Sequence, residues 1–213
     1  MWSPSTRAAA PLAAVCALCL LGANIPLEVW PAPRPGDSYV FDPATFSAIW
    51  AERVLVPVLM ISANALMLVS LCALYRRDDT AMPGWQRGSA IVTLFGTVVW
   101  LLGLTLTSSS GPNDVVVGGF GVLVAACALF VTVPGLIAWG IGYLRTGKTR
   151  LGAAFAGAPL LTALYLAVSL SGVDFEPVGG LLLTAPTTVM ALFISYDLWA
   201  DTTIPVDAQH AAS

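Results

Sequence analysis

The longest stretch of this chain without a charged or histidine side chain runs from Val115 to Leu144. Its 30 residues would extend about 45 Å as an α-helix, whereas the hydrocarbon core of a bilayer is about 30 Å thick. Backbone polar groups within lipid must be satisfied inside a helix or a closed barrel. The stretch therefore predicts a membrane-spanning helix with length left over for a tilt or for a bend at Pro134–Gly135.

Five more uncharged runs of comparable length predict an all-α integral membrane protein, a bundle of six transmembrane helices. Only 10% of the 213 residues are charged, against about 25% in a soluble domain. We expect one transmembrane domain over residues 1–199, with an outer loop at 28–53, followed by a polar cytoplasmic tail at 200–213. The predicted spans are 8–27, 54–75, 88–107, 115–144, 151–171 and 178–196.

The placement of arginine and lysine predicts the orientation, because positively charged loops stay on the cytoplasmic side. With both termini cytoplasmic, only Arg34 and Arg53 lie outside, and the location expected is the cell membrane. The basic residues then inside are Arg7, Arg76, Arg77, Arg87, Arg145, Lys148 and Arg150. Aromatic residues interpreted as a belt at the inner boundary are Tyr75, Trp85, Trp139, Tyr143, Tyr196 and Trp199.

Residues 8–27 allow two interpretations, because a basic start before an apolar segment is also typical of a secretory signal peptide. Cleavage after Ala23 would place Leu21 where a small residue is required. Cleavage after Ala17 satisfies that rule but leaves too short an apolar region. We favour an uncleaved first span.

In the outer loop, Asp42–Pro43 is typical of a helix start and predicts a short helix from Ala44 to Arg53. The functional interpretation is a lid or a partner-docking element. The alternative, which we favour, is an interfacial helix anchored by Phe46 and Trp50 at the level of the lipid headgroups.

An ungapped alignment pairs residues 110–119 with residues 171–180, two outer turns that each lead to a glycine pair. Arg87 and Lys148 fall at the same offset. The pattern suggests a parallel duplication of helix pairs 3–4 and 5–6, an arrangement known among transporters. Chance similarity is the alternative, since the chain is rich in Gly, Val and Ser.

None of the six predicted spans contains a charged or histidine side chain. Proton coupling, voltage sensing and many pumping mechanisms depend on such groups within the membrane, so these classes lose support. The candidate midplane polar contacts are Ser62, Asn64, Thr93 and Thr97. Asn64 could contact a permeating solute, but we favour an interhelical hydrogen bond.

The cysteines and the single histidine indicate no cofactor site. Cys16 and Cys19 have the CxxC spacing of thiol oxidoreductases, but the middle of a span offers neither the positive charge nor the access that a reactive thiolate needs. We interpret them as packing residues. His210 lies in the predicted tail, which leaves no histidine for intramembrane haem, zinc or Ser–His chemistry. We expect no cofactor, no metal and no enzymatic activity, and the few basic residues predict no nucleic-acid binding.

Small residues four positions apart predict close helix contacts in spans four and five, either inside the bundle or against a homo-oligomer or membrane-protein partner. The pairs are Gly121 with Ala125, Ala138 with Gly142, Gly152 with Ala156, and Ala153 with Gly157.

The sequence favours a structural or accessory membrane component that acts through helix packing and the outer loop. The alternative is a small channel or carrier for a neutral or hydrophobic solute, not coupled through buried charged residues. Possible kinks at Pro134, Pro159 and Pro186 favour that alternative. A polar, water-accessible cavity reaching the midplane near Asn64 would distinguish the two.

Overall fold

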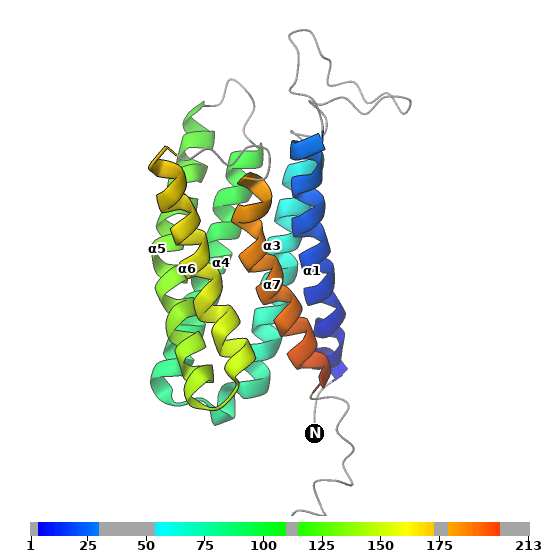
Figure 1. The fold of residues 1–213 in the computed structure, drawn as a ribbon, viewed down its shortest axis with the longest axis vertical. Helices are drawn as coiled ribbons and strands as arrows, with labels where there is room; N and C mark the ends of the chain where they lie inside the picture. The colour runs from blue at the N-terminus through cyan, green and yellow to red at the C-terminus, as the bar shows by residue number, and fades with distance from the viewer. Residues whose placement is uncertain (1–3, 30–53, 110–114, 173–178, 201–213) are drawn as a thin grey trace, which may run out of the picture.

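The computed structural model describes residues 4–29, 54–109, 115–172 and 179–200, and these form an all-α bundle (Figure 1). The helices are α1 (Pro4–Val29), α3 (Val56–Asp78), α4 (Gly84–Ser109), α5 (Val115–Arg145), α6 (Thr149–Leu170) and α7 (Gly179–Ala200), and a 3-10 turn, η2 (Asp79–Ala81), follows α3. Helices α3 to α7 are long and apolar enough to cross a membrane, and α1 has a shorter apolar part, Ala8–Asn24. The predicted fold class is confirmed.

Several helices extend beyond the predicted spans. Helix α3 continues to Asp78, three residues past the predicted end, and α4 begins at Gly84 instead of residue 88. Arg76 and Arg77 fit the last turn of α3, because arginine is a good helix former and its charge complements the negative end of the helix dipole. The predicted loop helix at 44–53 and almost all of the predicted tail lie outside the described residues.

Each described helix packs against the next one in the chain, and α7 packs along α1, so that the six helices form a closed ring. Helix α1 starts and α7 ends at the same end of the bundle (Figure 1). This end also carries Arg77, Arg87 and Lys148, and we call it the cytoplasmic end in accordance with the positive-inside rule.

The large buried side chains lie in the cytoplasmic half of the bundle. They come from the last turns of α3, α5 and α7 and from the start of α6, and include Leu74, Trp139, Phe155 and Ile194. Apart from Leu20, the buried positions in the outer half are mostly small or polar, and they include Ala23, Asn24, Ala63, Gly103, Gly121, Ala125 and Thr184. The outer half therefore relies on close backbone approach and hydrogen bonds more than on large side chains.

Helix α1 presents a stripe of small side chains to α3 and α7. Its buried residues recur alternately three and four positions apart, which keeps one face toward its neighbours; they include Ala9, Ala13, Cys16, Leu20 and Ala23. The Ser195 hydroxyl donates to the carbonyl of Ala10 at 2.8 Å, which ties α7 to α1 near the cytoplasmic end. Cys16 and Cys19 are free thiols, and Cys16 is buried in this packing.

Glycines hold α4 and α5 in backbone contact. A Cβ atom added at Gly103 would lie 2.7 Å from the backbone nitrogen of Ala125, and one at Gly121 would lie 2.7 Å from the nitrogen of Thr107. Gly121, Ala128, Gly135 and Gly142 are seven residues apart and all buried, so that one stripe of α5 faces α4 along most of its length. Several of the small residues predicted to form helix contacts are thus used inside this chain.

The helix pairs aligned as duplicates pack differently. In the ungapped alignment, Gly103 and Gly121 correspond to Leu164 and Leu182, and both leucines line an open groove between α6 and α7. The glycines that allow backbone contact between α4 and α5 are therefore not repeated at the aligned positions of α6 and α7. Most of the two aligned turns lies outside the described residues, so duplication stays a prediction.

We expect Gly103→Ala to lower the free energy of unfolding by about 1–3 kcal/mol, because the added methyl group would press against the backbone of Ala125. The matched control is Gly119→Ala on α5, where the new Cβ would have no neighbour within 4 Å. The control should leave stability unchanged or raise it by up to about 1 kcal/mol through helix propensity. Unfolding in mixed detergent micelles measures both variants, and equal stabilities would contradict the close contact.

Candidate functional site

Asn64 links two helices near the middle of the bundle. Its Oδ1 accepts a hydrogen bond from Trp100 Nε1 of α4 at 3.1 Å, and its Nδ2 donates to the carbonyl of Met60 at 2.7 Å. This is the interhelical hydrogen bond that we favoured for Asn64. The side-chain carbonyl of Asn64 is therefore occupied by a hydrogen bond from α4.

The other predicted midplane residues do not join Asn64 in one site. The hydroxyl of Thr93 donates to the carbonyl of Ser89 at 2.9 Å, and that of Thr97 donates to the carbonyl of Thr93 at 2.8 Å. Thr93 lies against Gly135 of α5, and Ser62 is half-buried on α3. The structure therefore distributes these polar groups among separate contacts.

A second polar contact in the spans joins α1 to α7. The buried Asn24 donates from Nδ2 to the hydroxyl of Thr184 at 2.8 Å and to the carbonyl of Leu20 at 2.6 Å. Sequence reasoning did not single out Asn24, although an asparagine within an otherwise apolar run is itself a signal of an interhelical hydrogen bond.

The main polar assembly lies at the cytoplasmic end, and we call it the Asp78 cluster: Arg77, Asp78, Tyr143, Lys148 and Asp197. The Asp78 carboxylate accepts hydrogen bonds from Arg77 Nε at 2.8 Å and Nη2 at 3.0 Å, a two-pronged arrangement that suits a guanidinium. Tyr143 Oη donates to the same carboxylate at 2.9 Å, and Lys148 Nζ lies 3.2 Å from both of its oxygens.

Arg77 extends the cluster to the last helix. Its side chain is 0% exposed, and its Nη1 donates to the backbone carbonyl of Asp197 at 3.2 Å. Its Nη2 also forms an ion pair with the Asp197 carboxylate. The cluster therefore joins α3, α5, α7 and the α5–α6 turn.

A cluster of three aromatic rings, Trp139, Tyr143 and Phe155, fixes the position of Tyr143. Its ring packs edge-on against Phe155 of α6, with centroids 5.7 Å apart, and Trp139 packs edge-on against the same Phe155 at 5.1 Å. Edge-to-face pairs of this kind are favourable beyond the area that they bury. The phenol hydroxyl is thereby held toward Asp78.

The turn between α5 and α6 places Lys148. Gly147 has a φ of +83°, a left-handed conformation that suits glycine, and ends α5. The amide of Lys148 donates to the carbonyl of Tyr143 at 3.0 Å, and that of Gly147 to the carbonyl of Leu144 at 3.3 Å, which is a Schellman motif. The chain reverses within this turn, and the ammonium group of Lys148 reaches Asp78.

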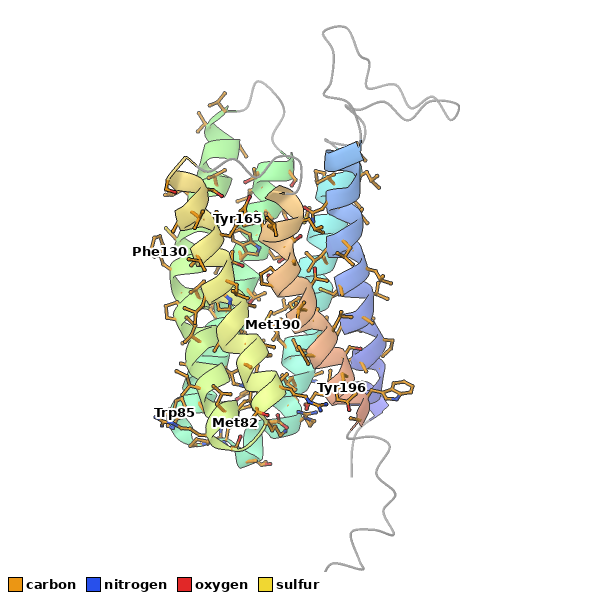
Figure 2. The ribbon with its side chains drawn as sticks, viewed as in Figure 1. Met82, Trp85, Phe130, Tyr165, Met190 and Tyr196 are labelled. Carbon is orange, nitrogen blue, oxygen red and sulfur yellow. The ribbon has the colours of Figure 1, made fainter. Side chains whose placement is uncertain are left out.

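Two of the predicted belt residues are core residues instead. Trp139 and Tyr143 are buried, so interpreting them as interfacial anchors was wrong, because their rings face α6 instead of lipid. Trp85, Tyr196 and Trp199 are exposed, and Trp85 and Tyr196 lie at the cytoplasmic end with Met82 (Figure 2). Trp85 and Tyr196 lie beneath the guanidinium groups of Arg145 and Arg150, at 5.4 and 5.8 Å.

Sequence reasoning missed the Asp78 cluster because it ended the second span at Tyr75 and assigned the next charges to a loop. The signal available was the Arg77–Asp78 pair directly after an apolar run, with Asp197 following the last run. Nearby, Asp79 pairs with Arg87 Nε at 2.6 Å, and this second pair is much more exposed.

The cluster is suited to holding helices together. Its two cations and two carboxylates balance in charge, and the Asp78 carboxylate accepts hydrogen bonds from three side chains. Within the described ranges, no three His, Cys, Asp or Glu side chains gather closely enough to hold a metal ion. No protein-family model matches this chain, and neither a curated protein nor a solved structure is significantly similar to it.

We expect Asp78→Asn to lower the free energy of unfolding by about 3–5 kcal/mol, because it removes one of the two counter-charges of the buried Arg77 guanidinium. The adjacent Asp79→Asn is the matched control. It breaks an exposed ion pair and should cost less than about 1 kcal/mol. Thermal unfolding in one detergent compares the two variants, and a similar loss in both would argue against a locking role for Asp78.

Proposed function

We propose that this multi-pass membrane protein is a structural or accessory component of the cell membrane, without catalytic activity of its own. The observation that carries the proposal is the hydrogen bonding of Asn64, the strongest candidate for solute contact. Its carbonyl oxygen and its amide nitrogen are engaged by Trp100 and Met60. The Asn24–Thr184 contact and the Asp78 cluster likewise direct polar groups toward neighbouring helices.

The alternative, a channel or carrier for a neutral solute, has less support. Such a path needs hydroxyl or carbonyl groups turned toward a water-filled space. The hydroxyls of Thr93 and Thr97 donate within α4, and the large groove described between α6 and α7 is lined mainly by apolar side chains. The proline positions that favoured this alternative are compatible with either role. The proposed accessory role acts through helix packing and the outer loop at 28–53, most of which lies outside the described residues.

Solute flux tests the proposal. We expect proteoliposomes containing the protein to admit glycerol and urea at the rate of protein-free liposomes, as measured by stopped-flow light scattering. Asn64→Ala and Trp100→Phe should each leave this rate unchanged and lower the free energy of unfolding by about 0.6–2 kcal/mol, because each removes the same interhelical hydrogen bond. Protein-dependent flux that Asn64→Ala abolishes would establish the carrier alternative.

The accessory role has its own test. Extraction into native nanodiscs without detergent should retain a membrane-protein partner in a fixed ratio to this chain. Recovery of the chain alone, or only with further copies of itself, would count against an accessory role.

A further inference from the structure

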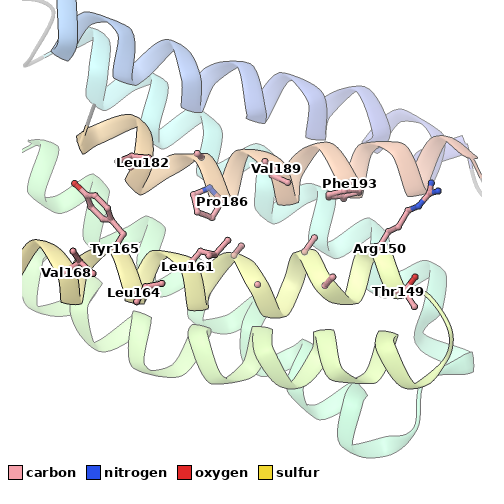
Figure 3. A pocket seen from close by; sticks show the side chains of 15 residues that line it. Thr149, Arg150, Leu161, Leu164, Tyr165, Val168, Leu182, Pro186, Val189 and Phe193 are labelled. Atoms are coloured by element: carbon pink, nitrogen blue, oxygen red, sulfur yellow. The ribbon is translucent and has the colours of Figure 1, made fainter. Parts of the chain in front are cut away.

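An open groove of about 900 Å³ runs between α6 and α7 on the lipid-facing side of the bundle (Figure 3). Along α6 it extends from Thr149 to Val168, which corresponds to about 28 Å of helix and is close to the thickness of the hydrocarbon core. Its walls are apolar, and its volume lies within the range of ligand-binding pockets.

The cytoplasmic half of the groove is open because its α6 wall consists of very small residues. Ala153 and Gly157, a pair that predicted helix contact, line it, and a Cβ atom added at Gly157 would meet no atom within 4 Å. The other predicted small pair of α6, Gly152 with Ala156, is in backbone contact with Gly140 of α5. None of the described helices therefore packs into the Ala153–Gly157 pair.

Arg150 provides the charge at the cytoplasmic mouth of the groove. Its side chain extends from α6 toward α7 (Figure 3), where the guanidinium lies over the ring of Tyr196. No carboxylate pairs with Arg150 among the residues that the structure describes. A guanidinium stacked on a ring keeps the N–H groups at its edge available to an anion, and phosphate is a preferred partner of arginine.

We propose that this groove binds one anionic phospholipid of the cytoplasmic leaflet, with its phosphate on Arg150 and an acyl chain along Gly157. The site matches the two parts of a phospholipid. Arg150 supplies a cation at the level of the headgroup, and the apolar groove continues from it toward the midplane, where an acyl chain would lie. Gly157 lies seven residues from Arg150, about 10 Å deeper along α6, which is within the roughly 15 Å of hydrocarbon in one leaflet.

Charge argues for a lipid over a second copy of this chain. Asp78, Asp79 and Asp197, the carboxylates described at the cytoplasmic end, are each ion-paired within the chain. Arg145 and Arg150 have aromatic partners instead. The described residues of a second copy seated in the groove in the same orientation would therefore bring further positive charge to Arg150, whereas an anionic headgroup neutralises it.

Native mass spectrometry of the purified chain tests the site, with phosphatidylglycerol and phosphatidylcholine of identical acyl chains as probes. We expect one phosphatidylglycerol to bind before any phosphatidylcholine. Arg150→Gln should weaken phosphatidylglycerol binding about tenfold, because it removes hydrogen bonds to a charged group, and leave phosphatidylcholine binding unchanged. Arg76→Gln, an equal charge change on exposed α3 surface, is the control.

Filling the groove tests its apolar part separately. Gly157→Leu should abolish phosphatidylglycerol binding. The control Gly119→Leu, where the new side chain also enters open space, should bind phosphatidylglycerol as well as the unmodified chain does. Glycerol 3-phosphate, which has the phosphate without the chains, should not compete. Equal binding of the two lipids, or unchanged binding by Gly157→Leu, would overturn the proposal. So would a dimer that Gly157→Leu converts to a monomer, because the groove would then hold a second copy.

Discussion

A buried guanidinium must be neutralised where it lies, and this requirement organises the cytoplasmic end of the bundle. Arg77 has no exposed side-chain surface, and its charge is met by Asp78 on its own helix and by Asp197 on α7. Asp78 in turn gathers Tyr143 and Lys148 from the α5–α6 hairpin. The large core residues lie beside this cluster, so packing and charge compensation act at the same level of the bundle.

The α4–α5 and α6–α7 pairs show how residue size at the contact affects how closely two helices pack in lipid. Between α4 and α5, glycines allow backbone contact, and dispersion forces hold the pair together. At the aligned positions α6 and α7 carry leucines, and an open groove lies between these two helices. Helices α4 and α5 therefore pack closely against each other, whereas the groove between α6 and α7 is open to the membrane.

Helix existence was predictable because backbone in lipid must form helices or a closed barrel, and uncharged runs of about 20 residues or more suit a spanning helix, whereas a barrel strand needs only about 9–11 residues. The Asn64 contact was predictable as well, since a carboxamide in lipid requires a partner. The Asp78 cluster was not, because charges at a span boundary are compatible with loops or helices, and only the packed bundle brings residues 78, 143, 148 and 197 together. The burial of Trp139 likewise depends on Phe155, a neighbour that periodicity within one helix does not reveal.

The separation of Arg77 from Asp197 also bears on how the protein is made. The two residues lie 120 positions apart, and α7 is the last of the described helices to be synthesised. At translation rates of about 5–20 residues per second, Arg77 exists for about 6–24 s before Asp197 is made. During that interval Asp78 is the only one of its two carboxylate partners available to Arg77. Tyr143 and Lys148 can bind Asp78 once they have been synthesised. The Arg77–Asp197 ion pair can therefore form only after α7, the last of the described helices, has been synthesised.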